Sequence, residues 1–495
     1  MEGKDQIGSD AWWFEQLMAG FDARVPDQWR PVGMDPEPTA YETRRDRLER
    51  LWSYHVGRAP LPQVAVEYTE IFRAVMRKAR CNYAGMAVNA MLDRMALAGV
   101  STATDNDVGG DDLAAEISEV SNLPTTMKDL FAYLFVMGES YGMVIPAKPG
   151  SDARPMISAL DPRNCIGDPD PDNPTICRAV VVRTCDPIMK VERAILFLPG
   201  RKRVAARSLA SAYSVNMLKW EWEGEPEKVE GIDQLGGIPI VRFDNAYGMG
   251  EFEGHVDLLD RINDTTLQRI VVTWYQSFRQ RGVIGDLEGD TDDDSDDAEP
   301  MTLEEFQDIF RADPGAMWRV PAGVQFWESG QADLGPIINA KRDDVKEFAA
   351  VTSTPLHLIT PDSANQSAEG ASLMREGHTA KVRDRRERVQ PRVKLLLRMA
   401  FALAGDPRRG NKIQIQWGSL QDNSLADQGS ATAQARGVLS LRNILVNIWG
   451  MTPTEAEQNI TELTAEQLLA LATTATQPPA NTTQPMPNST QPVSA

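Results

Sequence analysis

The sequence predicts an α+β protein in which long helices flank a block of β-strands. Apolar residues at three- and four-residue spacing dominate the first 137 residues, as in amphipathic helices. Short apolar runs separated by proline, glycine and aspartate turns then fill residues 141–243, as in strands. Long helical patterns return at 255–280 and 368–404. These three observations together predict the α+β class.

The N-terminal half is expected to hold four helical segments and then six strands. The helical segments are residues 10–21, 39–54, 68–97 and 125–137, and the first two are separated by Pro26, Pro31, Pro36 and Pro38. The strands are residues 141–145, 156–160, 179–183, 194–198, 217–222 and 238–243.

Two helices are then expected to enclose a small module. The first is residues 255–280, and the second opens at Pro336 and ends before Pro355. Between them we expect a strand at 283–285, a very acidic loop at 286–299, a short helix at 303–310 and a hairpin at 318–327. This order predicts a stalk with a cap at its tip. Two helices alone cannot bury all the apolar surface of the pair, so we infer that copies of the chain lie side by side.

A polar loop and a long basic helix follow the second stalk helix. Pro355 and Pro361 bracket the loop, which is small and nearly uncharged. A helix over 368–404 would be roughly 50 Å long, and Pro391 is expected to kink it. Its basic residues are Arg375, Lys381, Arg383, Arg385, Arg386, Arg388, Arg392, Lys394 and Arg398.

The C-terminal region is expected to be helical after one strand. The strand is residues 412–417, and the helices are residues 425–439, 441–449, 452–460 and 464–472. Thr464 and Gln467 fit a capping box that would start the last helix. From residue 473 the chain is rich in threonine, proline, glutamine and asparagine, which predicts a disordered tail.

Composition restricts the possible function. The net charge is −20, from 51 basic and 71 acidic residues, which argues against a protein that grips DNA over its whole surface. No apolar run approaches the length of a membrane span, and the N-terminus lacks the pattern of a secretion signal, so we expect a protein made and kept in the cytoplasm. The four cysteines have no metal-binding spacing and are expected to be free thiols.

The sequence contains no complete catalytic or cofactor-binding motif. The stretch from Asp290 resembles a calcium loop, but Ser295 occupies the glycine position and Met301 that of the bidentate glutamate. No P-loop and no nucleophile elbow occurs, and the histidines are isolated. We therefore expect no enzyme, no cofactor and no metal site. Two alternatives stay open: a metal-dependent nuclease or processing enzyme that uses the acidic 286–299 loop, and a monomeric scaffold or adaptor protein.

The chain resembles the portal proteins of tailed double-stranded DNA bacteriophages, in the type common among long-tailed phages of Gram-positive bacteria. The stretches that carry the resemblance are Asn82-Tyr83, Gly138-Glu-Ser-Tyr-Gly142, Leu160-Asp-Pro162, Gly237-Ile-Pro-Ile-Val-Arg-Phe-Asp-Asn245, Arg279-Gln-Arg-Gly-Val-Ile-Gly285 and Ser367-Ala-Glu-Gly-Ala371. Each stretch is weak alone, but their order covers most of residues 82–405.

The resemblance implies a portal fold assembled as a dodecameric ring around a DNA channel. Its parts would be the wing (1–252), the first stem helix (253–280), the clip (281–333), the second stem helix (334–355), the tunnel loop (356–371), the kinked spine helix (372–404), a wing strand and linker (405–423), the helical crown (424–472) and the tail (473–495). The ring would occupy one capsid vertex of the virion after assembly in the host cytoplasm. It would admit and release double-stranded DNA without sequence specificity.

The resemblance also implies partners and candidate site residues. The partners would be the large terminase subunit, the major capsid and scaffolding proteins and a head–tail adaptor, with no membrane contact. Ser363, Asn365, Gln366 and Ser367 in the tunnel loop would offer neutral hydrogen-bond partners to phosphates, so that DNA slides. Arg375, Lys381, Arg383, Arg385, Arg386 and Arg388 would face DNA or, as we favour, pair with acidic stretches of the next subunit. Asp286, Trp318, Arg319 and Trp327 would contact partners at the clip. The long acidic insertion in the clip and Pro391 in the spine depart from the family pattern.

Overall fold

The structure is a computed structural model, and it describes residues 6–23, 42–62, 69–102, 111–148, 150, 153–209, 219–277, 281–284, 325–328, 332–359, 368–420, 425–451 and 453–475. Its α-helices are α1 (Asp10–Phe21), α2 (Arg44–His55), α3 (Thr69–Ala79), α4 (Tyr83–Leu92), α5 (Asp112–Ser121), α6 (Leu123–Met137), α7 (Val256–Ser277), α9 (Gly335–Val351), α10 (Leu356–Ile359), α11 (Ala368–Leu403), α12 (Leu425–Ala435), α13 (Leu441–Asn447) and α14 (Pro453–Ala475). Its strands are β1 (Leu97–Thr102), β2 (Glu139–Ile145), β3 (Met156–Leu160), β4 (Cys165–Pro169), β5 (Cys177–Asp186), β6 (Val191–Leu198), β7 (Arg201–Ser208), β8 (Glu221–Trp222), β9 (Glu227–Lys228), β10 (Ile240–Asp244), β11 (Arg281–Ile284), β12 (Gln325–Glu328) and β13 (Ile413–Trp417).

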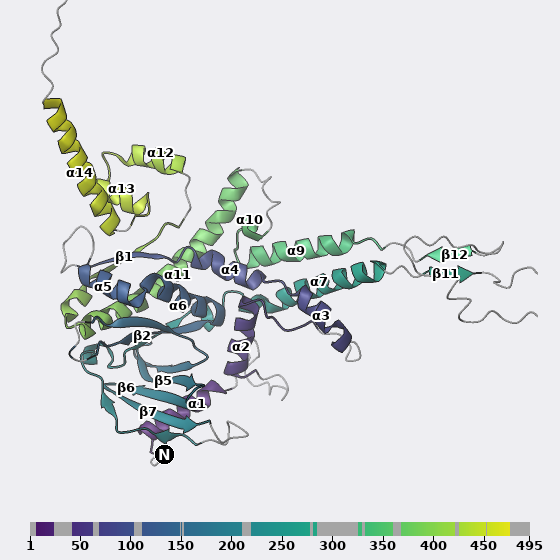
Figure 1. Cartoon of the computed structure of the whole chain (residues 1–495), viewed down its shortest axis with the longest axis horizontal. Helices are drawn as coiled ribbons and strands as arrows, with labels where there is room; N and C mark the ends of the chain where they lie inside the picture. Colours follow the sequence, from purple (N-terminus) through teal and green to yellow (C-terminus); the bar gives the residue numbers. More distant parts are fainter. Residues whose placement is uncertain are drawn as a thin grey trace, which may run out of the picture.

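The main core lies where α6 and α11 pack on the antiparallel sheet β10–β2–β3 (Figure 1). Leu130 and Phe135 of α6 are fully buried there. Gly142 of β2 lies directly under α11, since a Cβ at this position would meet the Leu396 side chain at 2.9 Å. The absence of a side chain at Gly142 therefore lets the long helix pack closely on the sheet.

A second antiparallel sheet has the order β4–β5–β6–β7–β8, and β9 also pairs with β7. Along β5, Ala179 and Val181 pack with Phe14 of α1, whereas Val180 belongs to the cluster around Tyr141 of the first sheet. Side chains alternate between the two faces of a strand, so this apolar run is buried on both sides. The second sheet is therefore sandwiched between α1 and the main core.

Strand β13 returns the chain to its N-terminal half after α11. It pairs antiparallel with β1, and Ile415 lies opposite Val100. The chain that follows the long helix is consequently tied to the N-terminal half of the protein.

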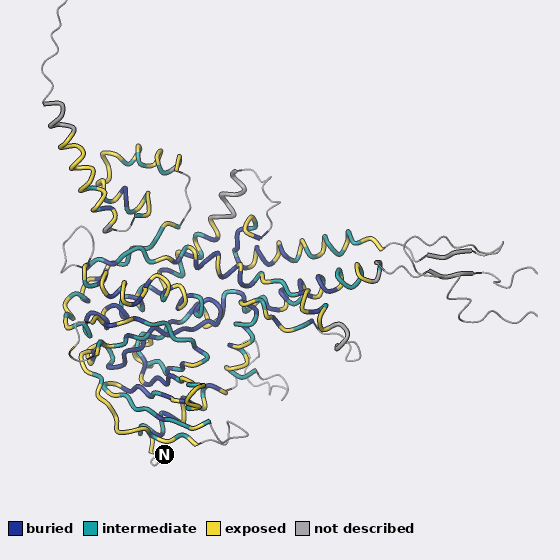
Figure 2. The backbone as a smooth tube through the Cα atoms, in the orientation of Figure 1, coloured by how far each residue is buried: buried dark blue, intermediate teal, exposed yellow. Residues whose placement is uncertain are grey.

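The helices α7 and α9 project together from the body and form a two-helix stem (Figure 1). Arg261 on α7 pairs with Asp344 at 2.9 Å and with Glu347 at 2.5 Å on α9. The strands β11 and β12 pair beyond the stem, with Val283 opposite Phe326. Figure 2 shows that buried residues concentrate in the body, while the outer stem is intermediate or exposed.

The α+β class is confirmed, as are many of the expected elements. Helix α1 has the expected bounds because Ser9 caps it, accepting a hydrogen bond from the Trp12 amide at 3.1 Å. The long helix over 368–404 is confirmed as α11, a helix of 36 residues that continues without a break through Pro391. The expected stalk helices are confirmed as α7 and α9.

A continuous helix over 68–97 was a wrong expectation. The chain forms two helices there, because Asn82 starts α4 by accepting a hydrogen bond from the Gly85 amide at 3.0 Å. Leu97 already belongs to strand β1. Separate helices at 452–460 and 464–472 were also wrong, since α14 is one helix that reaches Ala475. The Thr464 hydroxyl donates to the Ile460 carbonyl within this helix instead of capping a new one.

Several strands and two helices were missed by the sequence analysis. They are β1, β4, β7, β9, α5 and the four-residue α10, which opens the segment that was expected to be a loop. Strand β7 reads Arg-Lys-Arg-Val-Ala-Ala-Arg-Ser, and its charges obscure the alternation. Its arginines instead lie over aromatic rings, Arg203 on Trp222 at 4.5 Å and Arg207 on Trp220 at 4.4 Å. The expected helix at 303–310 and most of the hairpin at 318–327 lie outside the described residues.

All four cysteines are free thiols, as expected. Among the helices that the structure describes, none is long and apolar enough to cross a membrane.

Candidate functional site: the stem and its junction with the long helix

The stem carries an apolar groove on one side. Helices α3, α7 and α9 enclose a cavity of about 780 Å³ whose apolar lining is Val75, Ile270, Trp274, Leu334 and Ile338. The side of α7 is only partly covered by this chain, and Trp274 is 45% exposed. Large exposed aromatic surface of this kind is typical of protein–protein contacts.

Lys78 and Arg269 add two basic side chains to the lining of the same groove. Long basic side chains cover apolar surface with their methylene stems and keep the charge in solvent. An apolar floor with a polar margin has the composition of a docking surface.

At the base of the stem, one buried carboxylate joins the start of α7 to α11. Glu251 has a side chain that is 4% exposed, and it pairs with Lys381 at 2.8 Å and with Arg385 at 2.6 Å. The Asn245 amide also donates to its Oε1 at 3.0 Å. Burial alone would raise the pKa of Glu251, but the charge of Lys381 and the hydrogen bond from Arg385 outweigh burial and lower it. The carboxylate is therefore held in its charged form.

The same part of α11 also holds the end of α9. Lys381 donates to the Thr352 carbonyl at 2.9 Å. The ring of His378 lies between two carbonyl oxygens, with Nδ1 3.0 Å from Ser353 and Nε2 3.1 Å from Ala90. Burial lowers the pKa of His378 despite these two contacts. Ser353 has a φ of 54°, so the chain leaves α9 in a left-handed conformation that these contacts fix.

Further along α11, arginines tie the helix to the body. Arg386 donates to the carbonyls of Arg94 and, at 2.9 Å, of Gly418, and its guanidinium lies 5.4 Å from the Trp417 ring centroid. Burial lowers the pKa of Arg386 to about 10. Arg392 pairs with Asp244 at 3.0 Å. The helix is thus locked to β10 and to one end of the β1–β13 strand pair, where Leu97 lies opposite Trp417.

Two glycines let the Glu251 loop approach α6. A Cβ on Gly250 would lie 2.1 Å from the Val136 carbonyl oxygen, and a Cβ on Gly138 would lie 2.4 Å from that of Gly248. Neither space admits a side chain. This close approach of two backbone segments positions Glu251.

The predicted basic residues divide into two groups. Lys381, Arg385 and Arg386 bond within this chain, through the partners given above. Arg383 is exposed, and Arg388 is exposed while pairing with Asp384 at 2.8 Å. For Arg383 and Arg388 a contact with DNA or with the next subunit stays a prediction. Arg375 lies in α11, where only the backbone is described.

The other predicted site residues cannot be placed. Ser363, Asn365, Gln366 and Ser367 lie outside the described residues, as do Asp286, Trp318 and Arg319. Trp327 lies in β12, and only its backbone is described. Within the described ranges, no group of three or more His, Cys, Asp or Glu side chains is arranged to hold a metal ion. The acidic loop at 286–299 is not among those ranges.

A wing-like body, a projecting two-helix stem and a long helix that locks one to the other define the portal class of protein. The sequence matches the family described as phage portal protein, SPP1 Gp6-like, over residues 35–467, and the chain belongs to this family. Its members are phage portal proteins.

Besides the family, the chain is similar to solved structures. No curated protein matches the chain significantly. Similar solved structures include the neck of a native GTA particle computed with C12 symmetry, with a TM-score of 0.41 and 13% identity over 82% of this chain and 100% of that chain. They also include the neck of an empty GTA particle computed with C6 symmetry, with a TM-score of 0.40 and 13% identity over 79% of this chain and 95% of that one. The virion of a native gene transfer agent particle is similar with a TM-score of 0.40 and 15% identity, over 82% of this chain and 100% of that chain.

Proposed function

We propose that twelve copies of this chain form a ring at one capsid vertex, through which double-stranded DNA is packaged and later ejected. Family membership supports the portal role, and the apolar groove on the stem is the observation that supports a ring. In a ring, the groove on one copy meets a different surface of the next copy, and the contact repeats until the ring closes.

The groove has the properties that such a repeated contact needs. It is concave, its floor is apolar, and Trp274 projects partly into solvent beside it. Tryptophan is enriched among the residues that contribute most to binding at protein interfaces. The stem of the next copy would cover this surface and place the α7–α9 pairs side by side around a channel.

The ion pairs at the stem base give the ring a rigid frame. Glu251, Lys381 and Arg385 connect the first stem helix to the spine helix, and His378 connects the end of the second stem helix to α4 and α11. Force on the stem would therefore be carried into the wing through α11. The segments keep the proposed roles of wing (1–252), stem (253–280 and 334–355), clip (281–333), tunnel loop (356–371), spine (372–404) and crown (424–472).

The tunnel loop is proposed to support DNA without holding it. Ser363, Asn365, Gln366 and Ser367 are uncharged hydrogen-bonding residues, and neutral contacts lack the strong salt-dependent affinity of lysine for phosphate. The net charge of −20 also favours sliding of the DNA, because a negatively charged chain does not bind phosphates strongly over its whole surface.

The proposed partners meet different parts of the ring. The clip, including Asp286, Trp318, Arg319 and Trp327, would dock the large terminase subunit and afterwards the head–tail adaptor. The wing would contact major capsid and scaffolding proteins while the particle assembles in the cytoplasm of a Gram-positive host. ATP hydrolysis belongs to the terminase in this scheme, and this chain is not an enzyme. The nuclease alternative gains no support from the described residues.

Native mass spectrometry with particle images of the same purified sample tests this proposal. We expect a particle of twelve times 54.7 kDa with a central hole. A protein that stays a monomer or dimer over a range of salt and protein concentrations, including in the presence of scaffolding protein, would contradict it.

A further inference from the structure

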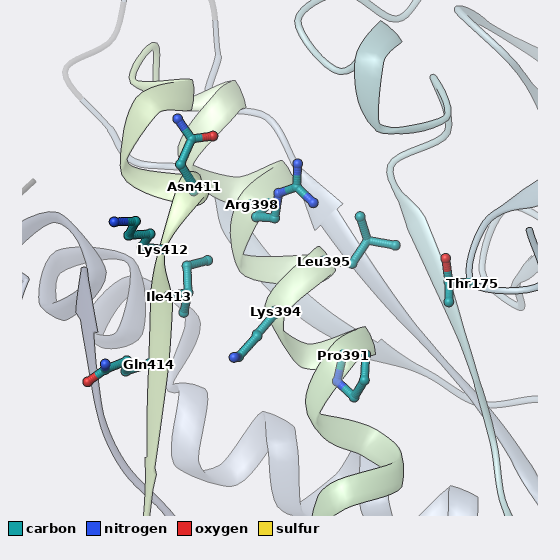
Figure 3. A pocket seen from close by; sticks show the side chains of 10 residues that line it. Thr175, Pro391, Lys394, Leu395, Arg398, Asn411, Lys412, Ile413 and Gln414 are labelled. Atoms are coloured by element: carbon teal, nitrogen blue, oxygen red, sulfur yellow. The ribbon is translucent and has the colours of Figure 1, made fainter. Parts of the chain in front are cut away.

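A second cavity lies far from the stem groove, between the C-terminal half of α11 and strand β13 (Figure 3). Its volume is about 650 Å³. Figure 3 shows Lys394 and Arg398 on α11, with Lys412 on the segment that faces this helix. Pro391, Leu395, Ile413, Thr175, Asn411, Gln414 and Gly410 complete the lining, and no acidic residue belongs to it. We call this the basic pocket.

The basic pocket differs from the neighbouring part of α11 in its balance of charges. Among the residues that the structure describes, none forms an ion pair with Lys394, Arg398 or Lys412. In contrast, Lys381, Arg385 and Arg392 on the same helix all pair with carboxylates. In a chain of net charge −20, three cations around one cavity without a carboxylate are an anion-binding arrangement.

The backbone also shapes this pocket. Gly410 lies against the stem of Arg398, since a Cβ there would meet Arg398 Cγ at 3.0 Å. The arginine is thereby supported along its methylene groups while its guanidinium stays at the rim and exposed.

The apolar floor of the basic pocket distinguishes between two classes of anionic ligand, a DNA duplex and an acidic peptide segment. Leu395 and Ile413 are apolar and buried, and Pro391 extends the apolar surface. The outside of a DNA duplex is phosphate and sugar, and a duplex is too wide to enter a cavity of this size. A peptide segment that carries carboxylates beside an aliphatic side chain fits both the cationic rim and the apolar floor.

One described segment of this chain has that chemistry. Helix α14 contains no lysine, arginine or histidine. Its residues Glu462, Glu466 and Leu469 are spaced i, i+4 and i+7 and so share one face. Both glutamates are exposed, and Leu469 is 69% exposed. In Figure 1, α14 points away from the body of its own chain, which leaves its exposed face open to a partner.

We propose that the basic pocket of one subunit binds the Glu462–Glu466–Leu469 face of α14 from a neighbouring copy. This inference rests on the proposed ring and adds a second, charge-based contact to the apolar contact of the stem. Leu469 would lie on Leu395 and Ile413, while Glu462 and Glu466 would pair with the rim cations.

Charge exchange between two variants tests the contact. Variant one carries Lys394→Glu and Arg398→Glu, and variant two carries Glu462→Lys and Glu466→Lys. We expect each alone to raise the subunit concentration at half-assembly at least tenfold. An equal mixture should return to within twofold of wild type, because alternating copies then present opposite charges at every contact. The double exchange Arg58→Glu with Arg408→Glu, at exposed basic residues outside the pocket, is the control and should assemble like wild type.

Cross-linking of the unmodified ring supplies the second readout. A zero-length carbodiimide should join Lys394 or Lys412 to Glu462 or Glu466, and mixing isotope-labelled with unlabelled subunits should show that the link joins two copies. Wild-type rings that lack these links, or variants that assemble normally, would overturn the inference while leaving the ring intact. Protection of Lys394 and Lys412 from acetylation by short duplex DNA, with no effect of variant two, would overturn it in favour of a DNA contact. If wild-type protein forms no ring, the proposed function fails before any variant is made.

Discussion

At the residue scale, the junction of the stem depends on one buried carboxylate. Glu251 receives contacts from two cations of α11 and from Asn245, and it lies at the entry to the first stem helix. A buried charge of this kind is stable only while its partners remain. The residue therefore couples the position of the stem to that of the spine helix.

The change Glu251→Gln tests this coupling. It removes the carboxylate that Lys381 pairs with and leaves Arg385 with Asp384 alone, and breaking such a buried pair costs about 3–5 kcal/mol. We expect urea unfolding of the variant at a clearly lower midpoint than wild type. Glu119→Gln, at an exposed position of α5, is the matched control and should stay within about 0.5 kcal/mol of wild type. Equal stability of the two variants would show that the Glu251 pairs do not hold the junction.

The same residue predicts how stability depends on pH. Its folded-state pKa is lowered from the ordinary value of 4.5, so the unfolded chain binds more protons than the folded one in the acid range. The stabilisation is fully present above that ordinary value and is lost as pH falls through the folded-state pKa. The difference in unfolding free energy between wild type and Glu251→Gln should therefore shrink on acidification. A difference that stays constant from neutral pH down to about pH 3 would contradict this account.

At the scale of elements, the loop before α7 depends on glycine. Gly250→Ala would place a Cβ 2.1 Å from the Val136 carbonyl oxygen, so α6 or the Glu251 loop must move. We expect a loss of about 1–3 kcal/mol, the usual cost of an overpacked site. Gly377→Ala in α11 is the control, because nothing lies within 4 Å of its Cβ position, and it should stabilise the helix by about 0.5–1 kcal/mol. Thermal unfolding should show a loss of stability for Gly250→Ala and a gain for Gly377→Ala. A Gly250→Ala variant as stable as wild type would refute the close approach of the two backbone segments.

Periodicity predicted the elements that bury one clear face, such as α1 and α6, because their apolar spacing is regular. It failed where a single side chain decides the backbone path. Asn82 ends one helix and starts another, and no apolar period records that event. It also failed for β7, whose charged residues hide the alternation: Arg203 and Arg207 pack on tryptophan rings and also pair with Asp10 and Glu192.

The site was predicted only at the level of segments. The basic content of α11 was evident from the sequence, but the partners of Lys381, Arg385 and Arg386 come from residues up to 292 positions away. No sequence motif distinguishes Glu251 from the other acidic residues of the chain, which has 71 in all. Only the packing of the glycine loop against α6 identifies it.

At the scale of the whole molecule, assembly is expected to depend on the stem groove. Trp274→Asp places a charge on the apolar surface that the next copy would cover, and a buried unpaired charge is strongly unfavourable. We expect the variant to fold with a far-ultraviolet spectrum like that of wild type and to remain monomeric in native mass spectrometry. Ile188→Asp, at a residue that is 89% exposed and remote from the stem, should assemble normally. Rings formed equally well by both variants would exclude this groove as the interface.

Each copy of the protein combines a frame in which the stem is locked to α11 with a surface that is left for contacts between copies. The described residues contain both parts: the ion pairs that join α7, α9 and α11, and the apolar groove that one chain leaves partly exposed. A portal protein needs the first to withstand the passage of DNA and the second to close a channel around it.

The most direct measurement is an electron cryomicroscopy reconstruction of the assembled wild-type protein. We predict a twelvefold ring in which the α7–α9 pairs line a central channel and Trp274 contacts the stem of the adjacent copy. A ring whose stems stand apart with Trp274 in solvent, or a sample without rings under every assembly condition, would contradict the account.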